Sequence, residues 1–542
     1  MKIALAQLNY HIGNFGANVN NIVSFINRAK SDNADIVVFS ELSVCGYPPY
    51  DLLGFSSFIN HCAGALDVIA SHTKGIAVVV GAPERNPDLR GKPFFNTAYF
   101  IADGIIKHKA YKSLLPDYDV FDEFRYFEPS NQFQTFTYNN HRIALTICED
   151  LWNLGQESLY HHSPMDELAK QGADLIINIA ASPFDYTQAP KRLDILKGNA
   201  VKYSMPLVYV NQVGAQTSLI FDGGSLALDC RGNISAKCKF FEEDYTCFDL
   251  NQPCGKSINY DISDVAKIHD ALILGIRDYF RKTGLKKAIL GLSGGIDSAV
   301  TLVLAVKALG KDNVMSLLMP SEFSSEHSVN DAVALAQNLS SPYSIVPVAD
   351  IYNAANGILS DIFKGLPFGI AEENLQARIR ALLLMAYSNK FGNVLLNTSN
   401  KSEAAVGYGT LYGDMCGAVS VLGDVYKTQV YELARYINLG KEIIPVNTIN
   451  KAPSAELKFD QKDSDSLPEY DILDKILFQY IENSLPPDDI IAAGYDNNIV
   501  KKVVHLVNTN EFKRFQCPPI LRVSPKAFGS GRQIPIVAKF PF

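Results

Sequence analysis

The stretch Lys287 to Ser298, KAILGLSGGIDS, carries residues whose order suits phosphate chemistry. A short apolar run of strand type breaks into Ser293-Gly294-Gly295, and a helical run follows from Ser298. Adjacent glycines let the backbone turn sharply and present N–H groups, and a helix start adds unpaired N–H groups that favour an anion. Asp297 puts a carboxylate beside that position, which suits a Mg²⁺ that bridges phosphates.

The loop lacks the Lys-Ser/Thr pair of the Walker P-loop, so transfer of a γ-phosphate is not indicated. For a lone Gly-Gly pair, an ordinary strand-to-helix turn would be the simpler interpretation. The complete SGGxDS string after a strand is much more specific.

Three polar side chains in the first half form a second chemical set. Glu41 follows VVFS, Lys112 follows KAY and Cys148 follows ALTI. A thiol nucleophile needs a base or a nearby cation, and a tetrahedral intermediate needs a donor to its oxyanion. Glu41 can be the base, Lys112 the cation and oxyanion partner, and Cys148 the nucleophile. Taken singly, each would be an inert buried thiol or a solvated charge, so the set depends on a fold that brings the three together.

The elements of the first half must position this set. Strands are predicted at 2–8, 35–42, 76–82, 95–102, 142–147, 174–180, 207–213 and 218–228, with helices near 18–31 and 57–74. This strand-rich α/β order predicts sheets covered by helices.

The second half begins after a stretch at 251–264 that has turn residues and no periodicity, which indicates a linker. An amphipathic helix follows and stops at Gly284; its apolar stripe is Val265, Ile268, Leu272, Ile276 and Phe280. Further predictions are a helix to Leu309, strands at 314–319 and 394–397, and a long helix over 371–390.

Strands that alternate with helices predict a parallel, doubly wound sheet, with ligands outside the carboxyl ends of its strands. SGGIDS and TSNKSE, which follows strand 394–397, would share that edge. Glu403 in TSNKSE could then supply a second carboxylate for Mg²⁺ opposite Asp297. The alternative is a solvated residue at a helix start.

Composition narrows the class of protein. A chain of 542 residues suffices for at least two domains, and a net charge of −8 argues against a nucleic-acid surface. The nine cysteines are scattered without a CxxC pair, which favours reduced thiols in a cytoplasm over disulfides or a zinc site. No apolar run reaches the roughly 18 residues of a membrane span, and Gln7 and Asn9 interrupt any signal-peptide core.

Three blocks in the first half, FSELSVCGYPP, YKSLLPDYDVFDEFRYF and ICEDLW, resemble the signatures of the nitrilase, or carbon–nitrogen hydrolase, family over about residues 1–250. The resemblance implies an αββα sandwich with Glu41, Lys112 and Cys148 as its catalytic residues. It also implies glutamine contacts, which would come from Tyr118, Glu123, Ser182 and Lys191. The family's basic residue follows the serine more closely than Lys191 or Arg192 follow Ser182 here.

SGGIDS resembles the pyrophosphate loop of the ATP pyrophosphatase superfamily, which cleaves ATP to AMP and pyrophosphate. NLQARIRALLLMAYSN, LLNTSNKSE, GYGTLYGD, GDVYKTQVYELA, KAPSAEL and FKRFQCPP extend the resemblance to the NAD synthetase domain, over about 288–519. The resemblance implies ATP contacts at Gly291, Leu292, Ser293, Gly294, Gly295, Ile296, Asp297, Ser298, Thr398 and Lys427. Deamido-NAD contacts would be Asn374, Glu403, Asp414 and Lys513, with Mg²⁺ at Asp297 and Glu403. Arg378 and Arg380, two apart on a helix, cannot share a face, so at most one should reach the site.

Together the resemblances imply a glutaminase domain at 1–250, a linker at 251–264 and an ATP-pyrophosphatase domain at 265–542. The expected reaction is glutamine- and ATP-dependent amidation of deamido-NAD to NAD, through a cysteine thioester and an adenylated carboxylate. Mg²⁺ would be the cofactor, the partners would be small-molecule substrates, and the chain would form a cytoplasmic homodimer or larger homo-oligomer. Ammonia is mostly protonated at neutral pH, so a protected path between the sites is expected. Residues 451–468 are interpreted as a mobile lid, with a surface loop as the alternative.

Three other functional hypotheses fit the sequence less well. GMP synthetases carry a different glutaminase domain, and asparagine synthetases need an N-terminal cysteine, a position that Lys2 occupies here. An inactive first domain with free ammonia as donor, or a non-enzymatic nucleotide sensor, would leave complete catalytic sets unused.

Overall fold

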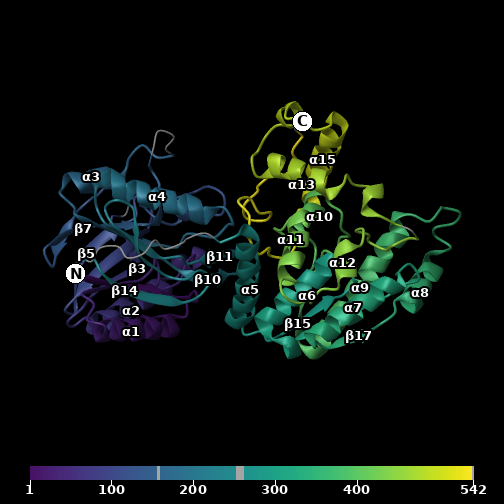
Figure 1. Ribbon diagram of the computed structural model, residues 1–542, viewed down its shortest axis with the longest axis horizontal. Coiled ribbons are helices and arrows are strands. Elements are labelled where there is room, and N and C mark those ends of the chain that lie inside the picture. Colours follow the sequence, from purple (N-terminus) through teal and green to yellow (C-terminus); the bar gives the residue numbers. More distant parts are fainter. Residues whose placement is uncertain (89, 155–158, 252–261, 460, 540–542) are drawn as a thin grey trace. The chain divides into compact units, whose positions relative to one another are not determined.

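The computed structural model describes residues 1–88, 90–154, 159–251, 262–459 and 461–539 (Figure 1). The chain divides into two compact units, unit 1 (Met1–Asp261) and unit 2 (Ile262–Phe542). The predicted linker falls largely on 252–261, outside the described residues. Within the described ranges, no helix is long and apolar enough to cross a membrane.

Unit 1 contains two six-stranded mixed sheets and a hairpin. The first sheet has the order β14 (Asp244–Asp249), β1 (Lys2–Gln7), β2 (Ile36–Val38), β3 (Ala77–Arg85), β4 (Phe94–Ala102) and β5 (Ile105–Tyr111). The second has the order β13 (Ile234–Lys237), β12 (Leu226–Leu228), β9 (Leu207–Asn211), β8 (Leu175–Ala180), β7 (His141–Ile147) and β6 (Phe136–Tyr138). The hairpin is β10 (Val213–Gln216) with β11 (Leu219–Asp222).

Alternation along the strands builds the layers of unit 1. Ile3 and Leu5 of β1 join one core with Ile143 and Ile177 of the second sheet, so the two sheets face each other. The opposite face of the first sheet packs on α1 (Phe15–Ser31) and α2 (Ser56–Ser71). Helices α3 (Pro164–Lys170) and α4 (Gln188–Tyr203) cover the second sheet, which gives the predicted αββα sandwich (Figure 1).

Two predicted strands are wrong in extent. The strand predicted at 218–228 is divided into β11 and β12, because Gly223 and Gly224 adopt φ values of +68° and +63° and turn the chain. The strand predicted at 35–42 ends at Val38. The following segment crosses β3 so closely that a Cβ on Gly81 would lie 2.3 Å from the backbone N of Leu42. This close crossing carries Glu41 into the interior.

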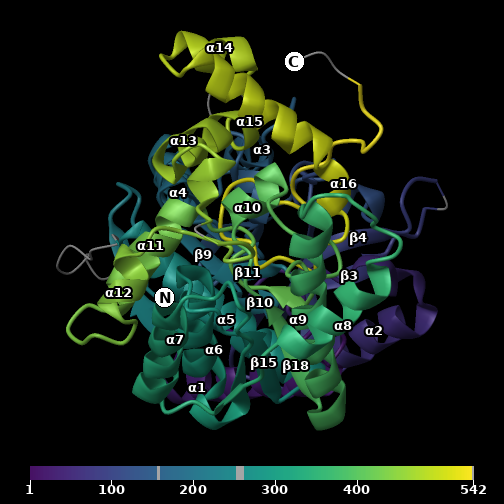
Figure 2. The ribbon, with the colours of Figure 1, turned by 90° about the vertical axis from the view of Figure 1, so that its right-hand side faces the viewer.

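Unit 2 is built on a five-stranded parallel sheet with the order β17 (Tyr343–Ile345), β16 (Val314–Leu318), β15 (Lys287–Gly291), β18 (Asn393–Asn397) and β19 (Val419–Ser420). Its helices are α5 (Asp264–Thr283), α6 (Ile296–Leu309), α7 (Glu326–Leu339), α8 (Ala349–Leu359) and α9 (Ile370–Phe391). Figure 2 shows α6 and α7 on one side of β15 and β18, and α8 and α9 on the other, as in a doubly wound fold. The strand order reverses between β15 and β18, where such sheets bind ligands.

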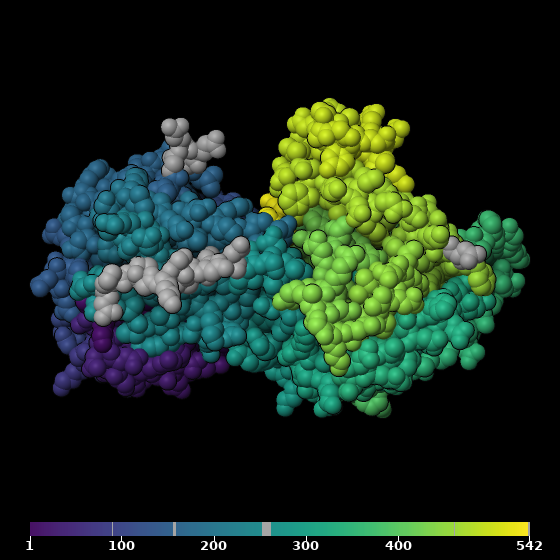
Figure 3. All heavy atoms as spheres, in the orientation of Figure 1, coloured from purple at the N-terminus to yellow at the C-terminus, as the bar shows by residue number. Residues whose placement is uncertain are grey.

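The remaining helices of unit 2 are α10 (Lys401–Val406), α11 (Lys427–Ile437), α12 (Val446–Asn450), α13 (Tyr470–Ile481), α14 (Pro487–Ala492), α15 (Asn497–Thr509) and α16 (Glu511–Arg514). Helices α10, α13 and α15 share an apolar core, and the space-filling view shows the α13–α15 region as the yellow part of unit 2 (Figure 3).

The segment from Ile520 to Lys526 extends along this region. Ile520 bridges Ser420 of β19, and the carboxylate of Asp424 accepts hydrogen bonds from the backbone N–H groups of Val523 and Ser524 at 2.8 and 2.6 Å. The fully buried Lys401 at the start of α10 donates to Ser524 Oγ (2.7 Å) and Lys526 O (2.8 Å). This segment therefore anchors α10.

Candidate active sites

Unit 1 brings Glu41, Lys112 and Glu123 into one buried ion cluster. Nζ of Lys112 lies 2.8 Å from Oε1 of Glu41 and 2.8 Å from Oε1 of Glu123, and all three side chains are buried. Glu41 follows β2, Lys112 follows β5 and Glu123 begins a short turn, so three separate segments meet. The pKa of Lys112 is well above its usual range, because the charges of Glu123 and Glu41 outweigh the effect of burial.

Cys148 stands directly after β7, at the start of a 3₁₀ turn that covers Cys148–Leu151. Its φ of +41° is unusual for a residue with a side chain and turns the backbone sharply away from the strand. Burial and the Glu41 carboxylate raise the pKa of the thiol well above its usual value, while Lys112 lowers it. The thiol is therefore protonated at neutral pH and requires a base when it attacks.

The carboxylate of Glu41 is held in a fixed orientation. Oε1 accepts a hydrogen bond from Nδ2 of Asn96 at 2.7 Å, and Oε2 accepts one from the backbone N–H of Ala181 at 2.8 Å. Burial raises the pKa of Glu123 to about 7, although Lys112 acts to lower it. Tyr47 donates to Oε1 of Glu123 at 2.9 Å, and Oε2 is buried with no hydrogen-bond partner in the part of the chain that the structure describes.

Glu149 is a functional candidate that the sequence did not single out. Its Oε1 accepts hydrogen bonds from Tyr118 Oη at 2.9 Å and Tyr160 Oη at 3.1 Å, and the side chain is buried. Loss of hydration raises the pKa of Glu149, although Lys112 acts to lower it. The predicted glutamine residue Tyr118 thus contacts a buried carboxylate next to Cys148. In the sequence, the only indication of a role for Glu149 is its position directly after Cys148.

Ser182 belongs to a second polar network. Its N–H donates to Oδ1 of Asn211 at 2.8 Å, and Nδ2 of Asn211 lies 3.4 Å from Asp222. Arg192 forms a buried two-bond pair with Asp222, at 3.0 and 2.7 Å. The basic residue in this network is Arg192, whereas Lys191 is exposed on α4. The glutamine contact of Lys191 stays a prediction.

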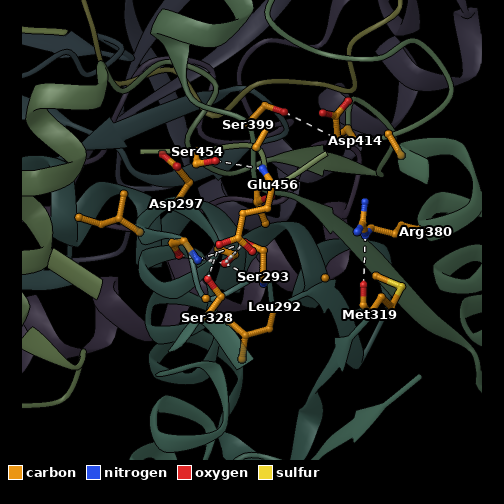
Figure 4. A pocket seen from close by; sticks show the side chains of 18 of the residues that line it. Leu292, Ser293, Asp297, Met319, Ser328, Arg380, Ser399, Asp414, Ser454 and Glu456 are labelled. Carbon is orange, nitrogen blue, oxygen red and sulfur yellow. Dashed lines mark hydrogen bonds between the residues drawn. The ribbon is translucent and has the colours of Figure 1, made fainter. Parts of the chain in front are cut away.

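Unit 2 contains a cavity of about 290 Å³ at the edge where β15 and β18 end. All residues of the predicted phosphate loop from Gly291 to Ser298 line it, as do Thr398, Glu403, Asp414 and Lys427. In Figure 4, Ser328 and Glu456 lie beside Ser293, and Arg380 and Asp414 lie on the other side of the cavity. The two predicted strand-end motifs therefore meet in one site.

The phosphate loop is shaped by its own serines and by α7. Ser293 Oγ and Ser298 Oγ lie 3.2 Å apart, and Ser298 Oγ donates to Gly295 O at 3.0 Å. Gly294 has φ of +81°, and a Cβ there would lie 2.1 Å from the carbonyl oxygen of Ser328. Only glycine fits this close approach. The backbone N–H groups of the loop and of the start of α6 therefore have no side chain at position 294 in front of them.

Lys427 joins the two carboxylates that were predicted as metal ligands. Its Nζ lies 2.6 Å from Asp297 Oδ2 and 3.4 Å from Glu403 Oε1. Burial raises the pKa of Glu403 to about 8, with Lys427 opposing and Asp297 reinforcing the shift. Asn400 was not predicted, but it contacts both acids: its Nδ2 donates to Asp297 Oδ1 at 2.9 Å, and its Oδ1 accepts from the backbone N of Glu403 at 3.0 Å.

These residues fit a magnesium ion. Mg²⁺ prefers oxygen ligands and is usually held by one or two carboxylates together with substrate phosphates. Asp297 and Glu403 present two such carboxylates to the nucleotide cavity. No group of three or more metal-binding side chains was found among the described residues, so phosphate and water oxygens would have to complete the shell.

The remaining predicted contacts lie on two sides of the cavity. Arg380 lines it and donates through Nε to Met319 O at 3.2 Å, whereas Arg378 is exposed and donates to Leu411 O. This agrees with the expectation that only one arginine reaches the site. Asn374 accepts from Thr410 at 2.7 Å, and Lys513 donates to Gly407 O at 2.8 Å. Both contact the segment that leads to Asp414, outside the residues that line the cavity.

Part of the predicted lid lines the cavity. Lys451 to Leu457 contribute to its wall. The carboxylate of Glu456 accepts hydrogen bonds from Lys451 (2.6 Å), Ser328 (2.7 Å) and Ser325 (3.0 Å), so it fastens this segment to the start of α7. Asp463, at the other end, is also in the wall, whereas Asp460 lies outside the described residues.

Comparison with known proteins agrees with this division. Residues 2–258 match the carbon–nitrogen hydrolase family, and residues 268–517 match the NAD synthase family. The glutamine-dependent NAD(+) synthetase of Synechocystis sp. is 45% identical, with 99% of each chain covered. That of Acinetobacter baylyi is 42% identical, over 99% of this chain and 98% of its own.

A solved structure is also similar over the whole chain. The glutamine-dependent NAD+ synthetase of Acinetobacter baumannii, in complex with ADP, has a TM-score of 0.79 and 39% identity, and 99% of this chain and 98% of that chain are covered. The two-family match, the high coverage and the two sites agree. The chain belongs to the family of glutamine-dependent NAD(+) synthetases, ligases that combine a carbon–nitrogen hydrolase domain with an NAD synthase domain.

Proposed function

We propose that unit 1 hydrolyses glutamine through a thioester at Cys148, and that unit 2 adenylates the nicotinate carboxylate of deamido-NAD, which ammonia then converts to the amide of NAD. The products are glutamate, AMP and pyrophosphate. The proposal rests on one grouping of residues in each unit. In unit 2, the SGGIDS loop, Glu403 and Lys427 share one cavity, and in unit 1, Glu41 and Lys112 share one buried cluster beside Cys148.

In the proposed glutaminase step, Glu41 takes the proton of the Cys148 thiol while Sγ attacks the amide carbon of glutamine. The oxyanion accepts hydrogen bonds from Nζ of Lys112, a cation that burial and two carboxylates hold in place. Glu41 then returns the proton to the departing nitrogen, which leaves as ammonia. Water hydrolyses the thioester to glutamate with Glu41 again as the base.

We assign glutamine recognition to the side of the site that carries Glu149. Glutamine has an α-ammonium group, and Glu149 is a buried carboxylate with an unfavourable desolvation that such a cation would relieve. Tyr118 and Tyr160 orient this carboxylate through their hydroxyl groups. Glu123, Ser182 and Lys191 are the further proposed contacts of glutamine.

In the proposed synthetase step, a carboxylate oxygen of deamido-NAD attacks the α-phosphorus of ATP, and pyrophosphate leaves. Backbone N–H groups of the loop 293–298 and the start of α6 would hold the phosphates. Lys427, which pairs with Asp297 and Glu403 in this structure, would turn to the phosphates and neutralise their negative charge. Ammonia displaces AMP from the acyl-adenylate. Asp297 and Glu403 would hold Mg²⁺, which would supply further neutralisation of phosphate charge. The ADP in the Acinetobacter baumannii structure supports an adenine nucleotide.

The proposed deamido-NAD contacts are Asn374, Glu403, Asp414 and Lys513. Glu403 and Asp414 line the cavity, and the side chains of Asn374 and Lys513 bond to the segment that leads to Asp414. The segment 451–468, described except for residue 460, is proposed as a lid over ATP, and Glu456 fastens its first part to the start of α7.

We also infer a homo-oligomer in the cytoplasm. Ile358, Ile362, Leu366 and Ile370, around α8 and the start of α9, each have 73–77% of their surface exposed, which favours a covered apolar face in solution. Every described cysteine is a free thiol, as expected in a reducing compartment. Molar mass by light scattering, compared between the wild type and Ile362→Asp, tests the oligomer: a monomeric wild type would contradict it.

The decisive experiment supplies deamido-NAD, ATP and glutamine and identifies the nucleotide products. One AMP and one pyrophosphate per NAD formed are expected, with glutamate in at least equal amount. ADP and orthophosphate as the stoichiometric products would refute adenylation.

A further inference from the structure

Asp150 is a buried carboxylate that none of the proposed steps uses. It lies two residues after Cys148, with 3% of its surface exposed. Its oxygen atoms accept three backbone hydrogen bonds: Oδ1 from Ser113 N (3.0 Å) and Leu114 N (2.9 Å), and Oδ2 from Ile147 N (3.0 Å). The two oxygens therefore serve two different segments of unit 1.

Each of these segments carries one member of the catalytic set. Ile147 ends β7 and immediately precedes Cys148, whereas Ser113 and Leu114 immediately follow Lys112. Strand β7 belongs to the second sheet, and β5, which leads to Lys112, belongs to the first. Asp150 consequently bonds across the two sheets at the point where nucleophile and cation meet.

The bond to Ile147 also supports the unusual backbone of Cys148. Residues held at positive φ persist only where their surroundings fix them. The Asp150 side chain closes the 3₁₀ turn back onto the N–H of Ile147, which holds the turn that begins at Cys148. Burial raises the pKa of Asp150 to about 6 against the lowering effect of the three hydrogen bonds, so the carboxylate is ionised at neutral pH and both oxygens accept.

We propose that Asp150 is a positioning residue of the glutaminase site: its carboxylate fixes the turn that begins at Cys148 to the segment that follows Lys112, so that Nζ of Lys112 stays where it receives the oxyanion. The proposal rests on the assignment of Cys148 as nucleophile. It concerns a residue that touches neither substrate nor reacting atoms.

The test is Asp150→Asn. The side-chain amide of asparagine has only one acceptor oxygen. The variant can therefore accept either from the N–H groups of Ser113 and Leu114 or from the N–H of Ile147, and its NH₂ group then faces the N–H that is left without an acceptor. Asp174→Asn is the matched control, because Asp174 is also in unit 1 and its side chain is half-exposed in a pair with His141. Both variants are assayed as the full chain, with glutamate release, ammonia-dependent NAD formation and thermal unfolding measured for each.

For Asp150→Asn we expect the kcat of glutamate release to fall about 10²-fold, as misplacement of reacting groups does, with the KM for glutamine within about threefold of the wild type. Ammonia-dependent NAD formation should be unchanged. The pH profile for inactivation of glutamate release by iodoacetamide should move to higher pH, because Lys112 no longer lies where it lowers the pKa of Cys148. Asp174→Asn should match the wild type in every assay.

A merely structural role predicts a different pattern. Fewer molecules would fold, glutamate release would fall in proportion, and the inactivation profile of the active remainder would stay in place; that pattern overturns the proposal. If Asp150→Asn is recovered unfolded, Asp150→Glu keeps the charge but moves it by one methylene, and the same shift of profile is expected. If Cys148→Ala retains glutamate release, the proposed function itself fails. If Cys148→Ala loses glutamate release but both Asp150 variants keep the kcat and the pH profile of the wild type, only the positioning role fails.

Discussion

Nζ of Lys427 lies 2.6 Å from Oδ2 of Asp297, although 130 residues separate them along the chain. Lys427 begins α11, and Asp297 lies in the first turn of α6, directly after the phosphate loop. This pair places a cation against a carboxylate that we assign to Mg²⁺, so the charge of Asp297 is offset within the protein before phosphates arrive.

Asp297→Asn should remove NAD formation with either nitrogen donor while glutamate release continues. The loss of one carboxylate removes stabilisation of phosphate charge that is worth several kcal/mol, so a decrease of at least about 10²-fold is expected. NAD formation with glutamine and with ammonium chloride measures it. Asp312→Asn, at an exposed position after α6, serves as control. Near wild-type synthesis by Asp297→Asn would remove Asp297 from the site.

The stability of the protein should depend on pH through Glu403. The pKa of this carboxyl is raised from 4.5 to about 8, so between these pH values the folded protein holds a proton that the unfolded chain has released. The contribution of Glu403 to the free energy of unfolding must therefore decrease as pH rises through this range. Glu403→Gln is neutral at every pH and lacks this dependence.

Relative to the wild type, Glu403→Gln should gain stability from pH 5 to pH 8, measured as the free energy of unfolding in urea. Glu432→Gln, exposed on α11, should run parallel to the wild type. Parallel curves for Glu403→Gln as well would mean that Glu403 is not desolvated in the folded protein.

Cys148→Ala should separate the two activities. Glutamine-dependent synthesis should fall by several orders of magnitude, because only binding and oxyanion assistance remain when a nucleophile is removed. Synthesis from ammonium chloride should stay within a few-fold of the wild type and rise with pH as free ammonia increases. Cys230→Ala, at an exposed thiol, is the control. Retained glutamine use would make Cys148 a structural thiol, and loss of both activities in a folded variant would exclude an ammonia relay.

Gly294→Ala should disable only the synthetase. The added Cβ would lie 2.1 Å from the carbonyl oxygen of Ser328, a backbone atom that cannot yield without moving the loop or α7. Displacement of the phosphate-binding N–H groups should reduce NAD formation about 10²-fold from either donor. Gly284→Ala is the control: its φ of +77° carries the same backbone strain, but no atom lies within 4 Å of the added carbon. If both variants retained full NAD formation, the close approach of Gly294 to Ser328 of α7 would not be needed for synthesis.

Periodicity and strand–helix alternation predicted the parallel sheet and the helix from Asp264 to Thr283, with its stop at Gly284, because these depend on local patterns. The predicted strand at 218–228 failed at Gly223, where a Cβ would lie 2.3 Å from the side chain of Gln7. The adjacent Gly223 and Gly224 are themselves a local turn signal, and their positive φ values break the strand. The contact with Gln7, more than two hundred positions away, adds a long-range reason that no local pattern contains.

The site divides in the same way. Motifs indicated Glu41, Lys112, Cys148 and the SGGIDS loop, since their residue types match a chemistry. Asn400 and Asp150 act through backbone N–H groups and through other side chains, and an Asn at a helix start or an Asp after a Glu has no distinctive signature. The pairing of Lys427 with Asp297 depends on the strand order β15-β18-β19, which brings the chain that follows β19 to the same edge of the sheet as the loop that follows β15.

The anchoring of α10 by residues 520–526 has a consequence for how the protein comes into being. A ribosome delivers chains from the N-terminus, and domains generally fold as they emerge. Glu41, Lys112 and Cys148 can assemble once unit 1 has been translated. The buried ammonium group of Lys401, in contrast, must wait for Ser524 and Lys526 before its hydrogen bonds are complete. During synthesis the nucleophile therefore matures hundreds of codons ahead of the nucleotide site, and a chain interrupted before residue 520 would present the first without the second.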